Sequence, residues 1–93
     1  MGNRSNGKAM LEDQRTSQSA VLREILTNLR TTAQLTQAQL SSKLSRPQSY
    51  VSKYESGERK LTFIEVREIA ICTGSTLSEF VEAFEEELAM IES

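Results

Sequence analysis

The segment LTQAQLSSKLSRPQSYVSKYESG, residues 35–57, decides the fold, because it holds two short helical patterns with very few residues between them. The first pattern begins with Thr36 as a candidate N-cap. Gln39 stands three residues later, where it completes a capping box. Leu40 and Leu44 have the spacing of one helix face, so they supply the buried side of this helix.

The second pattern follows after a turn. Ser45 and Arg46 leave room for a turn only. Pro47 fits the first helical position or the cap, because the missing N–H of proline is not needed there. Gly57 fits the end of the helix, where a positive φ is favoured. The spacing therefore predicts a second helix over residues 47–56.

The predicted helix over residues 47–56 has an apolar and a polar side. Val51 and Tyr54 lie three residues apart and are expected to point inward. The outward side then carries side chains that donate or accept hydrogen bonds: Gln48, Ser49, Lys53, Tyr50 and Ser52.

Two short helices joined by a turn of three or four residues are typical of a helix-turn-helix. A helix in the major groove of DNA recognises sequence only if its outward face offers donors and acceptors to the base edges. Gln bridges adenine N6 and N7, Lys reaches guanine O6 or N7, and Ser bonds either base. Gln48, Ser49 and Lys53 are therefore candidates for reading bases.

One helix is expected before this motif. Ser17 or Ser19 caps it, and it ends near Ala33. Its apolar side chains follow helical spacing: Leu22, Ile25, Leu26, Leu29 and Ala33. Residues 1–16 are polar and lack a sustained apolar period, so we expect a flexible N-terminal arm there, either solvated or touching DNA. Residues 17–93 then form the DNA-binding domain with an extended acidic C-terminal helix.

Two helices are expected after the motif. Thr62 and Glu65 form another capping-box pattern, and Gly74 ends the helix that they begin. Its inner face is outlined by Phe63, Val66, Ile69, Ala70 and either Cys72 or Thr73. The last helix begins after Ser75 or Thr76, with Leu77, Phe80, Val81, Phe84, Leu88 and Ile91 on one face. No alternation typical of a strand occurs, so we expect an all-α fold of five helices.

The charge of the chain is divided between its two parts. Residues 1–60 hold ten Lys/Arg and five Asp/Glu, whereas residues 61–93 hold one Arg and eight Glu. A protein divided in this way can meet a polyanion with one part while the other part is repelled by it. The net charge of −2 therefore does not exclude a nucleic-acid partner.

The commonest general base and metal ligand is missing from the chain. The chain has no His, and the single Cys72 lies in an apolar stretch where a buried, inert thiol is expected. The four Gly are scattered and form no phosphate-binding loop. We expect no catalytic residue, no metal site and no cofactor, and hence a binding protein rather than an enzyme. The single Cys, the lack of a signal-peptide pattern and the lack of a long apolar run favour a cytoplasmic protein and no membrane partner.

The run LTQAQLSSKLSRPQSYVSKYESGERK resembles the Cro/C1-type (Xre-like) helix-turn-helix family over about residues 20–84. The resemblance rests on the LTQ-x-x-L start, Leu44, the Q-S-x-V-S-x-x-E run, and Gly57 with Arg59. It implies a compact five-helix bundle, the lambda repressor-like DNA-binding domain. It also implies a sequence-specific transcriptional regulator, which we expect to be a bacterial or phage, nucleoid-associated repressor that binds operator DNA as a homodimer.

The resemblance assigns roles to single residues. The helix over residues 47–56 becomes the recognition helix, with base contacts from Gln48, Ser49 and Lys53. Gln37 either contacts a phosphate and braces Gln48, as in the family, or serves only as the first residue of its helix. The full set of expected phosphate contacts is Gln37, Arg46, Ser56, Arg59 and Lys60. Arg30 and Glu55 match an ion pair that orients the recognition helix.

Two positions depart from the family pattern. Ser45 stands where the family commonly has Gly, so the turn must accept a side chain there. Tyr50 stands where a smaller residue is common. Tyr50 either adds a base contact through its ring or hydroxyl, or rests against the DNA backbone.

The acidic last helix admits two interpretations. Its apolar side outlasts the domain core, which makes Phe84, Leu88 and Ile91 a candidate dimer interface. Alternatively, this end folds back on the first helix.

Two other functions stay open: an antitoxin-like autoregulator that binds a protein partner through the acidic helix, and a protein-interaction adaptor without DNA binding.

Overall fold

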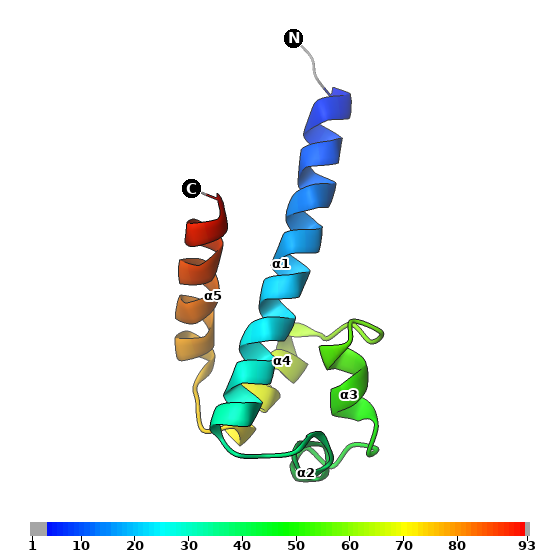
Figure 1. The fold of residues 1–93 in the computed structure, drawn as a ribbon, viewed down its shortest axis with the longest axis vertical. Helices are drawn as coiled ribbons and strands as arrows, with labels where there is room; N and C mark the ends of the chain where they lie inside the picture. The colour runs from blue at the N-terminus through cyan, green and yellow to red at the C-terminus, as the bar shows by residue number, and fades with distance from the viewer. Residues whose placement is uncertain (1–3, 93) are drawn as a thin grey trace.

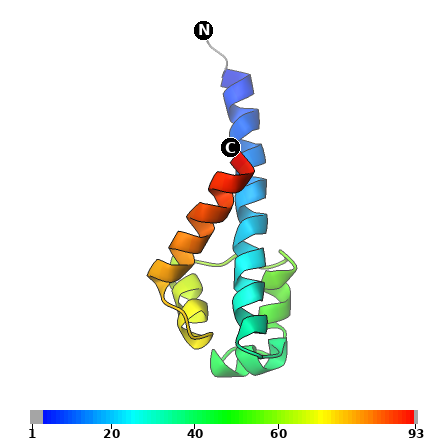
Figure 2. The same cartoon turned by 60° about the vertical axis from the view of Figure 1, so that its left-hand side comes forward.

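The computed structural model describes residues 4–92, with side chains from residue 15 onward, and within that range it contains five helices and no strand. The helices are α1 (Arg4–Thr32), α2 (Gln37–Lys43), α3 (Tyr50–Glu55), α4 (Phe63–Cys72) and α5 (Leu77–Glu92). α2, α3 and α4 gather around one end of α1, and α5 runs beside its middle (Figures 1 and 2). The predicted all-α fold with five helices is confirmed.

α1 begins earlier than the sequence pattern predicts. The expected start at Ser17 or Ser19 is wrong, because the helix already begins at Arg4. The segment before Ser17 contains good helix formers (Ala, Met, Leu, Glu and Gln) and no proline, so a helix that is fixed by packing further along can continue through it. Flexibility of residues 1–16 stays a prediction, and residues 1–3 lie outside the described residues.

α2 begins with the predicted capping box. The Thr36 hydroxyl accepts a hydrogen bond from the Gln39 amide at 3.0 Å, and the Thr36 amide donates to Gln39 Oε1 at 2.8 Å. These bonds satisfy two backbone donors that the first turn of a helix leaves free. The capping box at Thr62 and Glu65 is present as well, with distances of 2.9 Å and 3.1 Å.

α3 is shorter than the predicted helix over residues 47–56. Pro47 lies in a turn, in which the Tyr50 amide donates to the Pro47 carbonyl at 2.9 Å, and the helix starts only at Tyr50. Gln48 and Ser49 therefore precede α3 instead of lying on it. Of the residues expected on the polar side, Ser52 and Lys53 lie on α3.

Two residues with positive φ close the ends of the motif helices. Ser45, with φ of 56°, turns the chain after α2, so the side chain that replaces the family's common Gly is accepted in a left-handed conformation. Gly57, with φ of 88°, follows α3. A Cβ atom at Gly57 would lie 3.3 Å from the guanidinium of Arg23 on α1. The loop after α3 therefore passes close to α1, where glycine fits best.

One hydrophobic core joins all five helices. Each helix contributes at least one buried side chain: Leu26, Leu40, Tyr50, Val51, Tyr54, Val66, Ile69, Ala70 and Phe80. The predicted inward positions of Val51 and Tyr54 are confirmed, with 0% and 1% of their surface exposed. Because α3 contributes side chains to the core along its inner side, its orientation is fixed by packing.

Two of the residues assigned to apolar faces are exposed. Phe63, at the first position of α4, is 66% exposed, and Val81 on α5 is 42% exposed. The buried side of α4 consists of Val66, Ile69 and Ala70, one turn further along the helix. The expectation that Phe63 and Val81 face the core is therefore wrong.

The end of α5 packs along α1. Leu88 is 6% exposed, and Phe84 is half-buried and stacks on Phe80 with ring centroids 6.0 Å apart. Figures 1 and 2 both show α5 beside α1. The expectation that Leu88 stays unsatisfied within one chain is wrong, whereas Ile91 is 53% exposed. Among the helices of residues 4–92, none is long and apolar enough to cross a membrane.

The hydroxyl group of Tyr54 is buried in this core without a hydrogen-bond partner among the described residues. Burial raises the pKa of this phenol above its usual range. An unpaired buried polar group costs about 1–3 kcal/mol. We therefore expect Tyr54→Phe to raise the free energy of unfolding by about 1 kcal/mol, measured by urea denaturation. A loss of stability in this variant would mean that a water molecule or another group bonds the hydroxyl.

Candidate nucleic-acid interface

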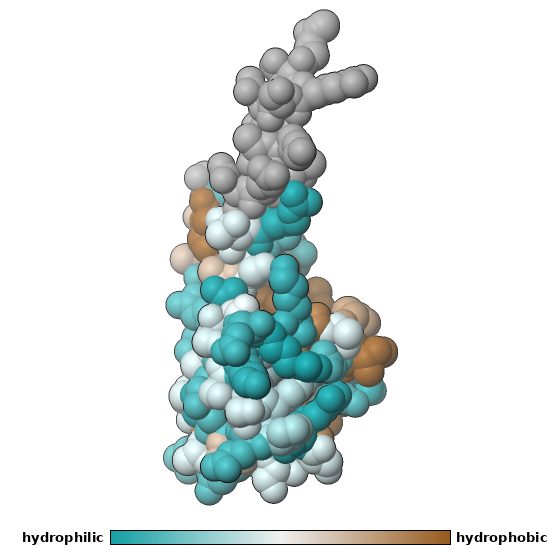
Figure 3. Space-filling view, turned by 90° about the vertical axis from the view of Figure 1, so that its right-hand side faces the viewer, coloured by the Kyte–Doolittle hydropathy of each residue, from teal (hydrophilic) through white to brown (hydrophobic). Residues whose placement is uncertain are grey.

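The expected interface consists of α3, the turn before it and the loop after it, which lie together at one side of the bundle (Figure 1). Residues 43–60 hold five Lys/Arg and two Glu. Figure 3 shows the molecule from this side, and its surface is mostly hydrophilic, with hydrophobic residues at the right-hand edge and at the upper left. The exposed large hydrophobic residues lie on α4 and α5: Phe63, Ile64, Ile71, Val81, Met90 and Ile91. The α3 side is therefore suited to a polar, anionic partner.

Ser41 on α2 fixes the turn that leads into α3. Its side chain is fully buried, and its hydroxyl donates to the Gln48 carbonyl and accepts from the Val51 amide, both at 3.2 Å. These two bonds join α2 to the start of α3. Our sequence analysis missed Ser41, because a small polar residue on a short helix gives no signal that its hydroxyl is buried.

The three expected base-reading residues are exposed, but only one of them lies on α3. Gln48 and Ser49 lie in the turn, and Lys53 lies on α3 itself. The Ser49 carbonyl accepts bonds from the Ser52 hydroxyl and the Lys53 amide, both at 3.0 Å. The backbone that carries the three side chains is thus held by α3, while the side chains themselves face solvent.

Tyr50 does not point outward, so this part of the sequence analysis is wrong. Its side chain is 5% exposed and belongs to the core, where its ring meets that of Tyr54 edge to face at 5.5 Å. The guanidinium carbons of Arg46 and Arg59 each lie 4.9 Å from the centre of the Tyr50 ring. A buried ring held by two cations is not available to read a base, and we no longer assign that role to Tyr50.

Glu55 at the end of α3 binds one residue of α1 and one residue of α2. Arg30 on α1 donates from Nε to Glu55 Oε2 at 2.7 Å and from Nη2 to Oε1 at 3.1 Å. The structure thus joins the two residues that the family resemblance pairs. The hydrogen bonds to Glu55 raise the pKa of the Arg30 guanidinium. Arg30 Nη1 also donates to the Leu35 carbonyl at 2.9 Å, which ties the entry to α2 into the same network.

Gln37 belongs to this network as well. Its amide donates to Glu55 Oε1 at 2.9 Å, whereas the sequence analysis expected it to brace Gln48. Gln37 is half-buried at the first position of α2. The side chain therefore links α2 to the end of α3 and not to its beginning.

Arg46 and Arg59, both expected to contact phosphates, converge on Glu65 of α4. Glu65 Oε2 accepts from Arg46 Nη2 at 3.2 Å and from Arg59 Nη2 at 2.7 Å. The backbone hydrogen bond from Thr62 lowers the pKa of the Glu65 carboxyl, and the bond from Arg59 acts in the same direction. Our sequence analysis assigned Glu65 only to a capping box, because its distance from Arg46 in the chain hides the contact.

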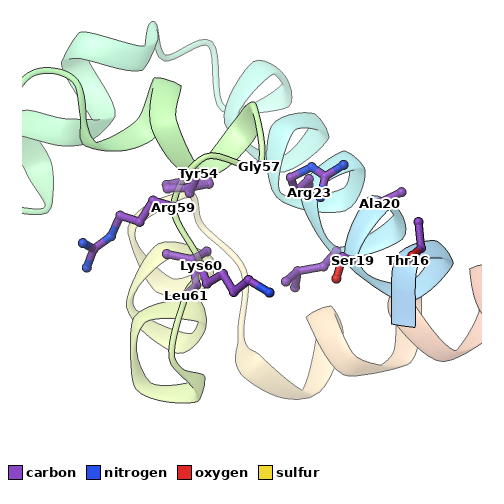
Figure 4. A pocket seen from close by; sticks show the side chains of 10 residues that line it. Thr16, Ser19, Ala20, Arg23, Tyr54, Gly57, Arg59, Lys60 and Leu61 are labelled. Atoms are coloured by element: carbon purple, nitrogen blue, oxygen red, sulfur yellow. The ribbon is translucent and has the colours of Figure 1, made fainter. Parts of the chain in front are cut away.

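The loop after α3 holds the two other expected phosphate contacts. Ser56 donates to the Lys53 carbonyl at 3.0 Å and is exposed. Lys60 is exposed and lines a cleft of about 410 Å³ between this loop and α1, together with Arg23. Arg59 also lines this cleft, but in Figure 4 its guanidinium end points away from α1, whereas the Lys60 side chain extends toward α1. The two neighbouring cations of the loop thus face different sides.

The comparisons with known proteins agree with this geometry. A family model described as helix-turn-helix matches residues 26–80, a span that includes α2, α3 and α4 completely. Neither the curated proteins nor the solved structures contain a match to the chain. Proteins of the matching family bind DNA through this motif and regulate transcription. On the match over more than half of its length, the chain belongs to the Cro/C1-type (Xre-like) helix-turn-helix family.

Proposed function

We propose that the protein is a transcriptional repressor that recognises one operator sequence through Gln48, Ser49 and Lys53. The observation that carries this proposal is the exposure of all three side chains on a backbone segment that is itself fixed by Ser41. Exposed Gln, Ser and Lys side chains supply the donors and acceptors that distinguish base pairs in the major groove. A rigid backbone reduces the entropy that these side chains lose on binding.

In the proposed complex, cations around α3 contact the DNA backbone. Ser56 and Lys60 are exposed at the loop after α3, and Arg46 and Arg59 are partly exposed on either side of Tyr50. Contacts to phosphates supply affinity that depends on salt, whereas contacts to base edges supply sequence preference. The acidic α5 lies along α1, and its charge favours an approach of DNA from the α3 side.

The proposed repressor is a bacterial or phage protein that acts as a homodimer in the bacterial cytoplasm. Two copies of the motif then contact half-sites about 34 Å apart, which is one turn of DNA. The candidate dimer interface includes Ile91, which is 53% exposed near the end of α5, and Phe84, which is half-buried. Leu88 is not part of this proposal, since it is buried within one chain.

The proposal is tested by the contribution of Lys53 to sequence preference. Lys53→Ala is expected to cost about 1–3 kcal/mol on the selected operator and to relax the preference at one base position. The operator is first obtained by binding-site selection from random DNA. Arg67→Ala is the matched control, because it also removes one positive charge, but from α4. Arg67 is the only Lys or Arg of residues 61–93. Equal losses for Lys53→Ala on operator and random DNA would argue against base reading.

A protein partner is the second candidate, and the surface of α5 supports it. Met90 is 74% exposed, and Ile91 lies next to it on a helix that is rich in Glu. An antitoxin-like regulator would cover these side chains with its partner and still bind its operator. An adaptor without DNA binding would instead show weak binding without sequence preference even at low salt, which separates it from both regulators.

A further inference from the structure

Four side chains from four consecutive segments of the chain meet at α3. Arg46 comes from the turn before α3, Tyr50 from its first residue, Arg59 from the loop after it, and Glu65 from α4. Both guanidinium groups bond the same oxygen, Glu65 Oε2, and both lie over the Tyr50 ring. The two Arg side chains are 37% and 41% exposed, whereas the Glu65 side chain is 10% exposed. The Glu65 carboxylate and the Tyr50 ring thus lie beneath the two guanidinium groups, and the guanidinium groups reach the surface.

Glu65 is itself held in place by α4. Its Oε1 accepts the Thr62 amide in the capping box, which leaves Oε2 for the two guanidinium groups. The capping boxes at Thr36 and Thr76 use Gln39 and Glu79 in the same position. Among the described residues, no arginine bonds the side chain of Gln39 or Glu79. The ion pairs with arginine are therefore not a requirement of capping.

The arrangement brings two positive charges together in a fixed place. Two guanidinium groups repel each other, and only a shared anion and the negative face of an aromatic ring hold them at close range. A guanidinium has five N–H groups, so its bond to Glu65 leaves further donors. Arg46 and Arg59, with one carboxylate between them, keep a net positive charge. Paired guanidinium groups of this kind match the several oxygen atoms of a phosphate.

We propose that Glu65 and Tyr50 position the guanidinium groups of Arg46 and Arg59 as a paired clamp for one phosphate of the DNA backbone. This proposal rests on the proposed function, since it concerns the same face of the molecule. Both guanidinium groups lie over the ring of Tyr50, which directly follows Gln48 and Ser49 in the chain, so the clamp lies next to the base-reading segment. Figure 4 shows the Arg59 side chain pointing away from α1. Glu65 and Tyr50 are positioning residues and do not touch the phosphate.

The clamp is tested with Glu65→Gln. Gln keeps the capping box, as Gln39 does in α2, but it removes the charge that holds the two cations. The matched control is Glu79→Gln, which makes the same change in the capping box of α5. We expect Glu65→Gln to reduce the ratio of operator to random-DNA affinity about tenfold relative to Glu79→Gln, without weakening binding to random DNA. A fixed phosphate contact matters in the specific complex, whereas loosely placed cations still attract any DNA.

The same experiment separates the clamp from a structural role. A variant that only loses stability loses operator and random-DNA binding together, in proportion to its unfolded fraction. Equal losses on both DNAs, or a ratio equal to that of Glu79→Gln, would overturn the clamp. The melting temperature of each variant is measured alongside, so that a folding defect is recognised directly.

A second measurement does not depend on sequence preference. The Nη–H signals of Arg46 and Arg59, whose Nη2 atoms donate to Glu65, are followed by NMR while a random duplex is added. In the wild type we expect both signals to be protected from exchange in the free protein and to shift together on addition of DNA. In Glu65→Gln the protection is lost. If the wild type prefers no sequence, the proposed function fails, while a common shift still supports the clamp. Unprotected signals, or signals that shift independently in the wild type, overturn the clamp.

Discussion

Arg30→Met is expected to lower the free energy of unfolding by about 3 kcal/mol, since it leaves the Glu55 carboxylate buried without its cation. The side chains of Arg30 and Glu55 are 14% and 8% exposed, so water replaces the lost partner only in part. Removal of one partner of a buried ion pair costs about 3–5 kcal/mol, and the partial exposure of Arg30 places this variant at the lower end. The Leu35 carbonyl loses its donor in the same step.

The measurement is urea denaturation of Arg30→Met beside the double variant Arg30→Met/Glu55→Met. The double variant removes the isolated charge, so it is expected to be more stable than Arg30→Met alone. If the double variant is less stable than the single one, the orphaned carboxylate is not the cause of the loss. Because Glu55 ends α3 and also binds Gln37, the single variant is expected to weaken DNA binding more than its unfolded fraction explains.

The helices that begin with local signals were predictable from the sequence. Thr36 and Thr62 each precede Gln or Glu at the third position, and the hydrogen bonds of a capping box involve only neighbouring residues. The inward positions of Val51 and Tyr54 follow from a spacing of three residues, which any helix places on one side. These features need no knowledge of the remaining chain.

The start of α1 and the start of α3 were not predictable in this way. α1 continues back to Arg4 because helix propagation needs no cap once the later part is packed. α3 starts only at Tyr50, because Ser41 and the Pro47 carbonyl bond the backbone of the preceding residues in a turn. Contacts from another helix decided this boundary over the local pattern.

The candidate site shows the same division between local and distant causes. Gln48, Ser49 and Lys53 are exposed, as an amphipathic helix predicts. Tyr50 is buried, because Arg46 and Arg59 cover its ring, and both cations are brought there by Glu65 on α4. No pattern within residues 47–56 contains that carboxylate, so burial of Tyr50 required the folded chain.

The second large effect is expected at the end of α5, where Leu88→Ala should lower the free energy of unfolding by about 3 kcal/mol, within the range for a buried leucine. Leu88 is 6% exposed, and its removal leaves a cavity where α5 packs along α1. The comparison variant is Met90→Ala on the same helix, at a residue that is 74% exposed, and we expect a smaller loss there than for Leu88→Ala.

Urea denaturation at two protein concentrations separates packing within one chain from a dimer contact. If Leu88 stabilises the single chain, its loss has the same effect at both concentrations, because no association equilibrium is involved. A loss that shrinks on dilution would instead place Leu88 between two chains. An equal loss in Met90→Ala would also contradict the packing of Leu88, because an exposed side chain has little surface to lose. A concentration-independent loss confined to Leu88→Ala would leave Phe84 and Ile91 as the residues of α5 to be tested for dimer formation.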